Sequence, residues 1–162
     1  MRVGEILIVG PKSVKKEVFL KRLCNRVEIQ EKGIQVGWLS LDNEMLLQCY
    51  GIHWNRFAKS YAWELLAAKA LGVIVLFDWD RPETVQTAEE IVEYFQENFA
   101  IPILTASNID ENSTEKIAVR AYRGGLPLDK NSRFTLYQLD QSDSIRQLIV
   151  DLVNINLEQM SV

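Results

Sequence analysis

The sequence has little of the chemistry that metal sites and disulfide scaffolds need. Its 162 residues include one histidine and two cysteines, Cys24 and Cys49, with no Cys-x-x-Cys pair. One histidine and two distant thiols do not make a four-ligand structural zinc site, so we expect no metal centre. So few cysteines fit a reducing compartment better than a disulfide framework.

The chain also lacks a long apolar run, an N-terminal signal pattern and any excess of positive charge. Without the first two we expect a cytoplasmic protein with no membrane span. The formal net charge of −4 gives no reason to expect a nucleic-acid partner. With 48% hydrophobic and 25% charged residues, the composition is that of an ordinary globular protein. We expect one domain over residues 1–162.

Short apolar runs alternate with longer segments of helical periodicity along the chain. The runs predict six strands, at residues 5–9, 34–41, 44–50, 73–77, 102–105 and 134–139. Helices are predicted at residues 16–25, 56–69, 83–99, 114–122 and 144–157. This order implies an α/β three-layer sandwich with a six-stranded, mostly parallel sheet. The early hairpin supplies one antiparallel strand.

The first predicted strand leads into a segment that half matches the phosphate-binding P-loop, G-x-x-x-x-G-K-[ST]. Gly10 and Lys16 occupy the first glycine and the lysine, whereas Lys15 replaces the second glycine and Glu17 replaces the Ser/Thr. The P-loop glycine lets the backbone approach phosphate, and the hydroxyl holds Mg²⁺. A long side chain and a carboxylate at these two positions disfavour both roles.

The lysines of this segment leave several interpretations open. Lys12, Lys15 and Lys16 could hold a nucleotide, hold another anion at the helix terminus, or form a solvated basic face. If a degenerate nucleotide site persists, its P-loop part is predicted to comprise Gly10, Ser13, Lys15, Lys16 and Glu17.

Longer segments resemble the bacterial Mgl-type branch of the small Ras-like GTPase family. "YGIHWNRF" resembles F-G-T-P-G-Q-E-R-F, and "AWELLAAKALGVIVLFDWDRPE" resembles W-E-x-x-x-x-G-A-L-G-A-I-V-L-V-D-x-x-R-P-E. "IPILTASNID" and "LDQSDS" resemble the segments that carry N-K-x-D and D-A-R-D. The resemblance covers nearly the whole chain and is strongest at residues 62–83. It implies a Ras-like P-loop fold, GTP or GDP with Mg²⁺ as ligand, and a roadblock-type protein partner.

The chain departs from that family where its members hold the phosphates. The first threonine is Thr84, so the switch I threonine is absent. Counting back from Arg56 places Trp54 at the water-orienting glutamine and His53 at the glycine that contacts the γ-phosphate. An indole has one N–H and no acceptor, so it cannot orient a water as an amide does.

The guanine-reading segment departs as well. Asn108 is kept, Ile109 replaces the lysine, and only a shifted Asp110 or Glu111 remains for the aspartate. Asp78, at a strand end, could approach a metal or serve a structural role.

Together these features predict a catalytically inactive GTPase-like domain, a pseudo-GTPase, that acts as a protein-interaction or regulatory module. We assign it no catalytic residue, no metal ligand and no cofactor. The alternative is an atypical small GTPase that binds GTP or GDP with slow or no hydrolysis. The predicted partner surface comprises Trp38, His53, Trp54 and Arg56, since tryptophan is enriched at binding hot spots. Trp54 could instead fold into an empty nucleotide cleft.

Overall fold

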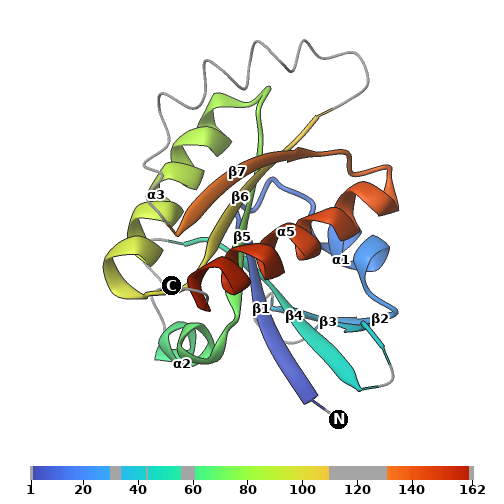
Figure 1. Ribbon diagram of the computed structural model, residues 1–162. Coiled ribbons are helices and arrows are strands. Elements are labelled where there is room, and N and C mark those ends of the chain that lie inside the picture. Colours follow the sequence, from blue (N-terminus) through green and yellow to red (C-terminus); the bar gives the residue numbers. More distant parts are fainter. Residues whose placement is uncertain (1, 30–33, 43, 56–60, 110–130, 161–162) are drawn as a thin grey trace.

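The computed structural model describes residues 2–29, 34–42, 44–55, 61–109 and 131–160; for residues 29, 61–64, 159 and 160 it describes the backbone alone. A seven-stranded sheet runs through the molecule, with helices on both faces (Figure 1). The strands are β1 (Arg2–Gly10), β2 (Arg26–Ile29), β3 (Gln35–Ser40), β4 (Met45–His53), β5 (Gly72–Asp78), β6 (Ile103–Asn108) and β7 (Ser132–Tyr137). The helices are α1 (Lys16–Leu23), α2 (Tyr61–Lys69), α3 (Pro82–Asn98) and α5 (Ser142–Met160).

The sheet order is β2-β3-β4-β1-β5-β6-β7. All neighbouring strands pair in parallel except β2 with β3 and β3 with β4, so β3 alone runs against the others. The predicted α/β class and mostly parallel sheet are thus confirmed. The predicted helix at residues 114–122 lies outside the described residues.

The prediction of six strands is wrong, because β2 is a seventh. Its sequence, Arg-Val-Glu-Ile, is only four residues long and carries two charges, so no apolar run reveals it. Its pairing with β3 begins beside Asn25, whose Oδ1 accepts the Ser40 backbone N–H at 3.1 Å. The strand therefore depends on a tertiary contact with β3 rather than on its own pattern.

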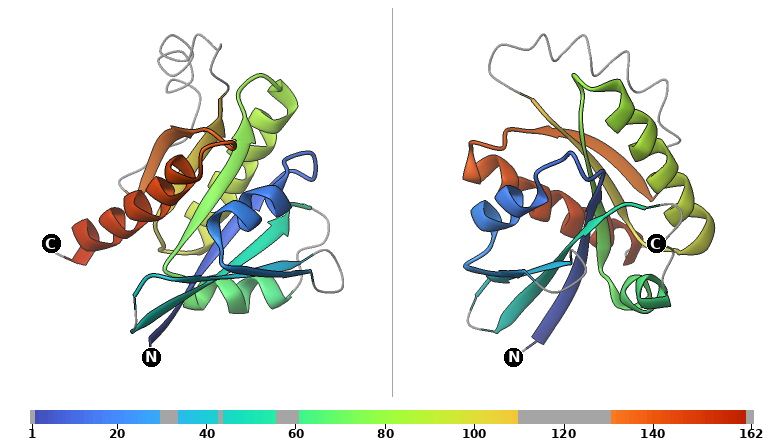
Figure 2. Two further views of the ribbon diagram at one scale, coloured as in Figure 1. Left: turned by 90° about the vertical axis from the view of Figure 1, so that its right-hand side faces the viewer. Right: turned by 180° about the vertical axis from the view of Figure 1, so that it is seen from behind.

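The sheet separates two apolar cores. Side chains of β1 alternate between them: Ile6 and Ile8 belong to the core under α1 and α5, and Leu7 and Val9 to the core under α3. Figure 2 shows α5 and α1 on one side of the sheet and α3 on the other. This double burial explains why β1 and β5 appear in the sequence as unbroken apolar runs.

β4 continues to His53, three residues beyond its predicted end. Its last pair with β1 joins His53 to Gly10, so the ends of the two strands lie side by side. The carboxyl ends of β1, β4, β5 and β6 therefore meet at one edge of the sheet, where open α/β sheets bind their ligands. Among the described helices, none is long and apolar enough to cross a membrane.

Candidate functional site

The segment between β1 and α1 folds back on itself through its own hydrogen bonds. The Val14 N–H donates to the Pro11 carbonyl at 3.0 Å, and the Lys16 N–H donates to the Val14 carbonyl at 2.9 Å. Lys15, between them, has φ −79° and ψ 75°, the geometry of an inverse γ-turn. An L-residue adopts this backbone freely, so the loop needs no glycine at position 15. Two of its N–H groups bond to loop carbonyls instead of pointing outward.

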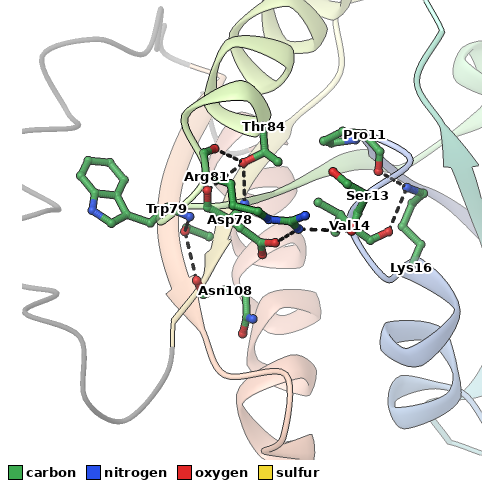
Figure 3. Close-up of polar contacts among 10 residues, drawn as sticks. Pro11, Ser13, Val14, Lys16, Asp78, Trp79, Arg81, Thr84 and Asn108 are labelled. Carbon is green, nitrogen blue, oxygen red and sulfur yellow. Dashed lines mark hydrogen bonds and ion pairs between the residues drawn. The ribbon is translucent and has the colours of Figure 1, made fainter.

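Lys16 points into this loop and is 1% exposed. Its Nζ donates to the carbonyls of Pro11 at 2.7 Å and Val14 at 3.4 Å (Figure 3). It also donates to the Gly10 carbonyl at 3.1 Å. An ammonium group has three N–H donors, and three carbonyls surround it here. Burial lowers the pKa of Lys16 from 10.5 to about 7. The lysine that would contact a phosphate thus donates its hydrogen bonds to the loop itself.

The other charged side chains of the segment are at least partly exposed to solvent. The Glu17 carboxylate forms an ion pair at 2.9 Å with Lys21, one helical turn on, where Lys21 is largely exposed and Glu17 partly exposed. Lys12 and Lys15 are exposed. The predicted basic cluster is therefore divided, with two solvated ammonium groups and one buried group. The described residues include no cluster of three or more His, Cys, Asp or Glu side chains placed to hold a metal ion.

Arg81 joins the loop to the end of β5, a role that sequence reasoning missed. Its Nη2 donates to the Ser13 carbonyl at 3.2 Å and forms an ion pair with the Asp78 carboxylate. Figure 3 shows the guanidinium reaching from the start of α3 toward the loop. The Asp78 carboxylate thus forms an ion pair with Arg81 instead of serving as a metal ligand. No periodicity could reveal this contact, since Ser13 and Arg81 lie 68 residues apart.

The turn that carries Arg81 is fixed by Thr84 and Ser107. The fully buried Thr84 hydroxyl accepts the Asp78 N–H at 3.0 Å and lies 2.7 Å from the carbonyls of both Asp78 and Arg81. The Trp79 N–H donates to Ser107 Oγ at 2.9 Å. Pro82 occupies the first turn of α3, where a helix tolerates proline.

His53 and Trp54 lie at the end of β4, beside the loop. The Trp54 indole donates from Nε1 to Glu90 Oε2 at 3.3 Å, and its ring centroid is 5.2 Å from that of Tyr94, both on α3. Trp54 therefore packs on α3 and does not fold over Lys16. Burial, and secondarily the charges of Lys16 and Lys12, lowers the pKa of His53.

A shallow pocket of about 460 Å³ opens at this place. Its lining includes Lys12, His53, Trp54 and Glu90. His53 Nδ1 has no hydrogen-bond partner among the described residues. The pocket lining thus combines an imidazole, an ammonium group, an indole ring and a carboxylate.

Asn108 closes the far side of this edge of the sheet. Its Oδ1 accepts the Leu139 N–H at 3.0 Å, which connects the ends of β6 and β7. Asp110 and Arg56 lie outside the described residues. Trp38 lies elsewhere: its β4 partner, Gln48, is five residues before His53, or about 16 Å along the strand. The structure thus brings Gly10, Ser13, Lys16, His53 and Trp54 together and places Trp38 apart.

Comparison with known proteins adds no relative. No protein-family model matches the chain, and no curated protein matches it significantly.

Proposed function

We propose that this chain is a Ras-like, GTPase-type domain that does not hydrolyse GTP and acts as a protein-interaction module. The observation that carries the proposal is the position of Lys16. To bind the Lys16 ammonium group, a nucleotide would have to draw it away from three carbonyls and out of its buried position. The loss of these buried hydrogen bonds would offset the attraction between the lysine and a phosphate.

The surroundings of Lys16 support the same conclusion. Glu17 pairs with Lys21 on the helix surface, and Arg81 neutralises Asp78. Trp54 offers no acceptor to an attacking water. The P-loop position for the Mg²⁺ hydroxyl ligand is Glu17, and the position for the water-orienting glutamine is Trp54. Phosphoryl transfer therefore lacks its usual aids at both positions.

The interaction role rests on the surface around the pocket. Lys12 is exposed there, and Trp54 and His53 are each partly exposed. Amphipathic rings and a lysine stem supply contact area with polar tips, which is the composition of interface hot spots. By resemblance, a roadblock-type protein is the first partner to test.

A nucleotide titration of the purified protein tests the first half of the proposal. A ligand that binds only the native state at a concentration of 100 Kd adds about 2.7 kcal/mol of stability, several degrees in Tm for a chain of this size. We expect GTP, GDP and ATP, each with Mg²⁺, to shift Tm by less than about 1 °C at millimolar concentration. The protein should also contain no nucleotide after denaturation and chromatography.

The opposite result would favour the alternative function. A larger shift with GTP or GDP than with ATP, abolished by Lys16→Ala, would indicate an atypical GTPase that binds nucleotide. Phosphate release that depends on Mg²⁺ would contradict the proposal outright.

A further inference from the structure

The two cysteines of the chain lie in the same core, under α1 and α5, although they come from different elements. Cys24 is the C-cap of α1, where its N–H donates to the Leu20 carbonyl at 2.8 Å, and Cys49 lies in the middle of β4. Cys49 is fully buried and Cys24 is 9% exposed. Both thiols are free, and neither belongs to the candidate site.

A glycine on β3 lets the Cys24 side chain approach Cys49. Gly37 pairs directly with Cys49, and side chains of such a pair have Cβ atoms about 4.5–5.5 Å apart on one face of a sheet. A Cβ on Gly37 would lie 2.6 Å from Cys24 Sγ and 3.1 Å from Cys24 Cβ. The Cys24 sulfur therefore occupies the space beside Cys49 that a side chain at position 37 would need.

The two cysteine side chains are in contact. A hydrogen bond with Cys24, and secondarily burial, raises the pKa of the Cys49 thiol. A disulfide needs Cβ atoms about 3.5–4.5 Å apart and side chains that point toward each other. Gly37 brings the backbones close, and the hydrogen bond shows that the side chains face each other. Side-chain rotations are therefore enough to bring the two sulfurs together.

We propose that Cys24 and Cys49 form an oxidative modification site, where a low-molecular-weight disulfide such as oxidised glutathione converts them to an intramolecular disulfide. Cys24, the more exposed of the two, attacks one sulfur of the small disulfide as a thiolate and releases the first small thiolate. Cys49 then attacks the Cys24 sulfur of this mixed disulfide and releases the second. The released thiolates take up the two protons that the cysteines lose. Two protein thiols are thus oxidised, and the small disulfide is reduced to two thiols.

The new bond closes residues 24–49 into a covalent loop that contains β2 and β3. Two hydrogen bonds already hold β3 to the residue after Cys24: the Asn25 N–H donates to the Trp38 carbonyl at 2.9 Å, and Asn25 Oδ1 accepts the Ser40 N–H at 3.1 Å. A closed loop of about 25 residues restricts the unfolded chain and thereby stabilises the fold. Oxidation therefore fixes the end of α1 to the strands on either side of Trp38. This inference goes beyond the proposed function and does not depend on how the chain treats nucleotides.

Equilibration of the full chain in mixtures of oxidised and reduced glutathione tests the proposal. An equilibrium measurement is suitable because it does not depend on how slowly a buried thiol reacts. Alkylation of the remaining thiols followed by mass spectrometry gives the fraction that carries a disulfide, and peptide mapping identifies the bond between Cys24 and Cys49. An intramolecular bond leaves the mass of a monomer, lower by two hydrogen atoms.

We expect the equilibrium constant for disulfide formation to be at least about tenfold larger in the folded chain than in the same chain in urea. In urea only the flexible loop brings the thiols together, which gives an effective concentration in the millimolar range. In the folded chain the core holds them in contact. A smaller ratio would overturn the proposal, and so would a disulfide that joins two chains.

Thermal unfolding gives a second measurement, because a bond that the fold favours must stabilise the fold by the same factor. A tenfold ratio corresponds to a rise in Tm of at least about 3 °C on oxidation for a chain of this size. Cys24→Ser and Cys49→Ala each keep one thiol and cannot form the bond, so their Tm should not rise in the oxidising buffer.

Each variant is compared with itself in oxidising and reducing buffer, so any loss of stability from the substitution cancels. A wild-type Tm that stays constant or falls on oxidation would overturn the proposal. A rise of the same size in either variant would also overturn it, since the cause would then be something other than the bond. Neither result would change the interpretation of the nucleotide titration.

Discussion

At the scale of single residues, Lys16 shows how a retained motif position can change its role. A lysine in a phosphate-binding loop projects toward the ligand, whereas here it donates to the loop's own carbonyls. Burial opposes its charge, and its pKa falls to about 7. The group is therefore protonated in the unfolded chain over a pH range in which the folded chain releases the proton. Folding must then become more favourable as pH rises through that range.

Lys16→Met makes this linkage measurable by removing the titrating group. Below about pH 7 both states of the wild-type chain are protonated at Lys16, and the cost of burying the cation is fully present. Between about pH 7 and pH 10 the wild-type free energy of unfolding should rise relative to the variant, by at most about 1.4 kcal/mol per pH unit. Urea denaturation of both proteins across this range measures the difference. A constant difference would mean that Lys16 keeps its charge in the folded chain.

At the scale of secondary structure elements, strand and helix assignments were predictable where burial alone decides them. β1, β5 and α3 followed from apolar runs and helical periodicity, with Pro82 at the start of α3. The β2 strand was not predictable, because its pairing with β3 stabilises it and its own sequence shows no apolar run. The end of β4 was also missed, since Gly51-Ile52-His53 looks like a loop until Gly10 is placed beside it.

The candidate site was predictable in position but not in conformation. Gly10 and Lys16 located the loop correctly, yet the direction of the Lys16 side chain depends on where three carbonyls point. The direction of Trp54 depends on Glu90 and Tyr94, more than 30 residues away in the chain. Such contacts follow from the packing of α3 and leave no periodic pattern in the sequence.

The turn between β5 and α3 depends on one buried hydroxyl, which Thr84→Val would remove at nearly constant volume. The Asp78 N–H would lose its acceptor, and the carbonyls of Asp78 and Arg81 would lose the hydroxyl donor that they share. We expect a loss of about 1–3 kcal/mol in the free energy of unfolding. Thr87→Val, on the same helix, is the matched control. Its hydroxyl donates to the Glu83 carbonyl at 3.0 Å near the surface, so its removal should cost less than about 0.5 kcal/mol.

Hydrogen exchange would show whether this turn positions the loop. With Thr84→Val we expect faster exchange at Val14 and Lys16, because Arg81 reaches the Ser13 carbonyl from the turn that the hydroxyl fixes. Unchanged protection of both amides, together with lost stability, would show that the loop holds its conformation without Arg81.

At the scale of the whole molecule, α5 joins the two halves of the sheet. Leu148 and Leu152 belong to the same core as Ile6 of β1 and Leu104 of β6. Figure 1 shows α5 crossing in front of the sheet, beside α1. The α5 helix thus completes the core that α1 and the central strands begin.

Asn156 provides a polar test of this long-range connection. Its Nδ2 donates to the Leu71 carbonyl at 2.6 Å, a contact between α5 and the start of β5 across 85 residues of sequence. Asn156→Ala leaves that carbonyl unpaired and should lower the free energy of unfolding by about 1–2 kcal/mol. Asn154→Ala, an exposed position of the same helix, should change it by less than about 0.5 kcal/mol. If α5 folds as one unit with the sheet, the loss at Asn156 should appear equally in circular dichroism of the helices and in tryptophan fluorescence. Two separate transitions would mean instead that α5 detaches first, because cooperative unfolding gives coincident curves for all probes.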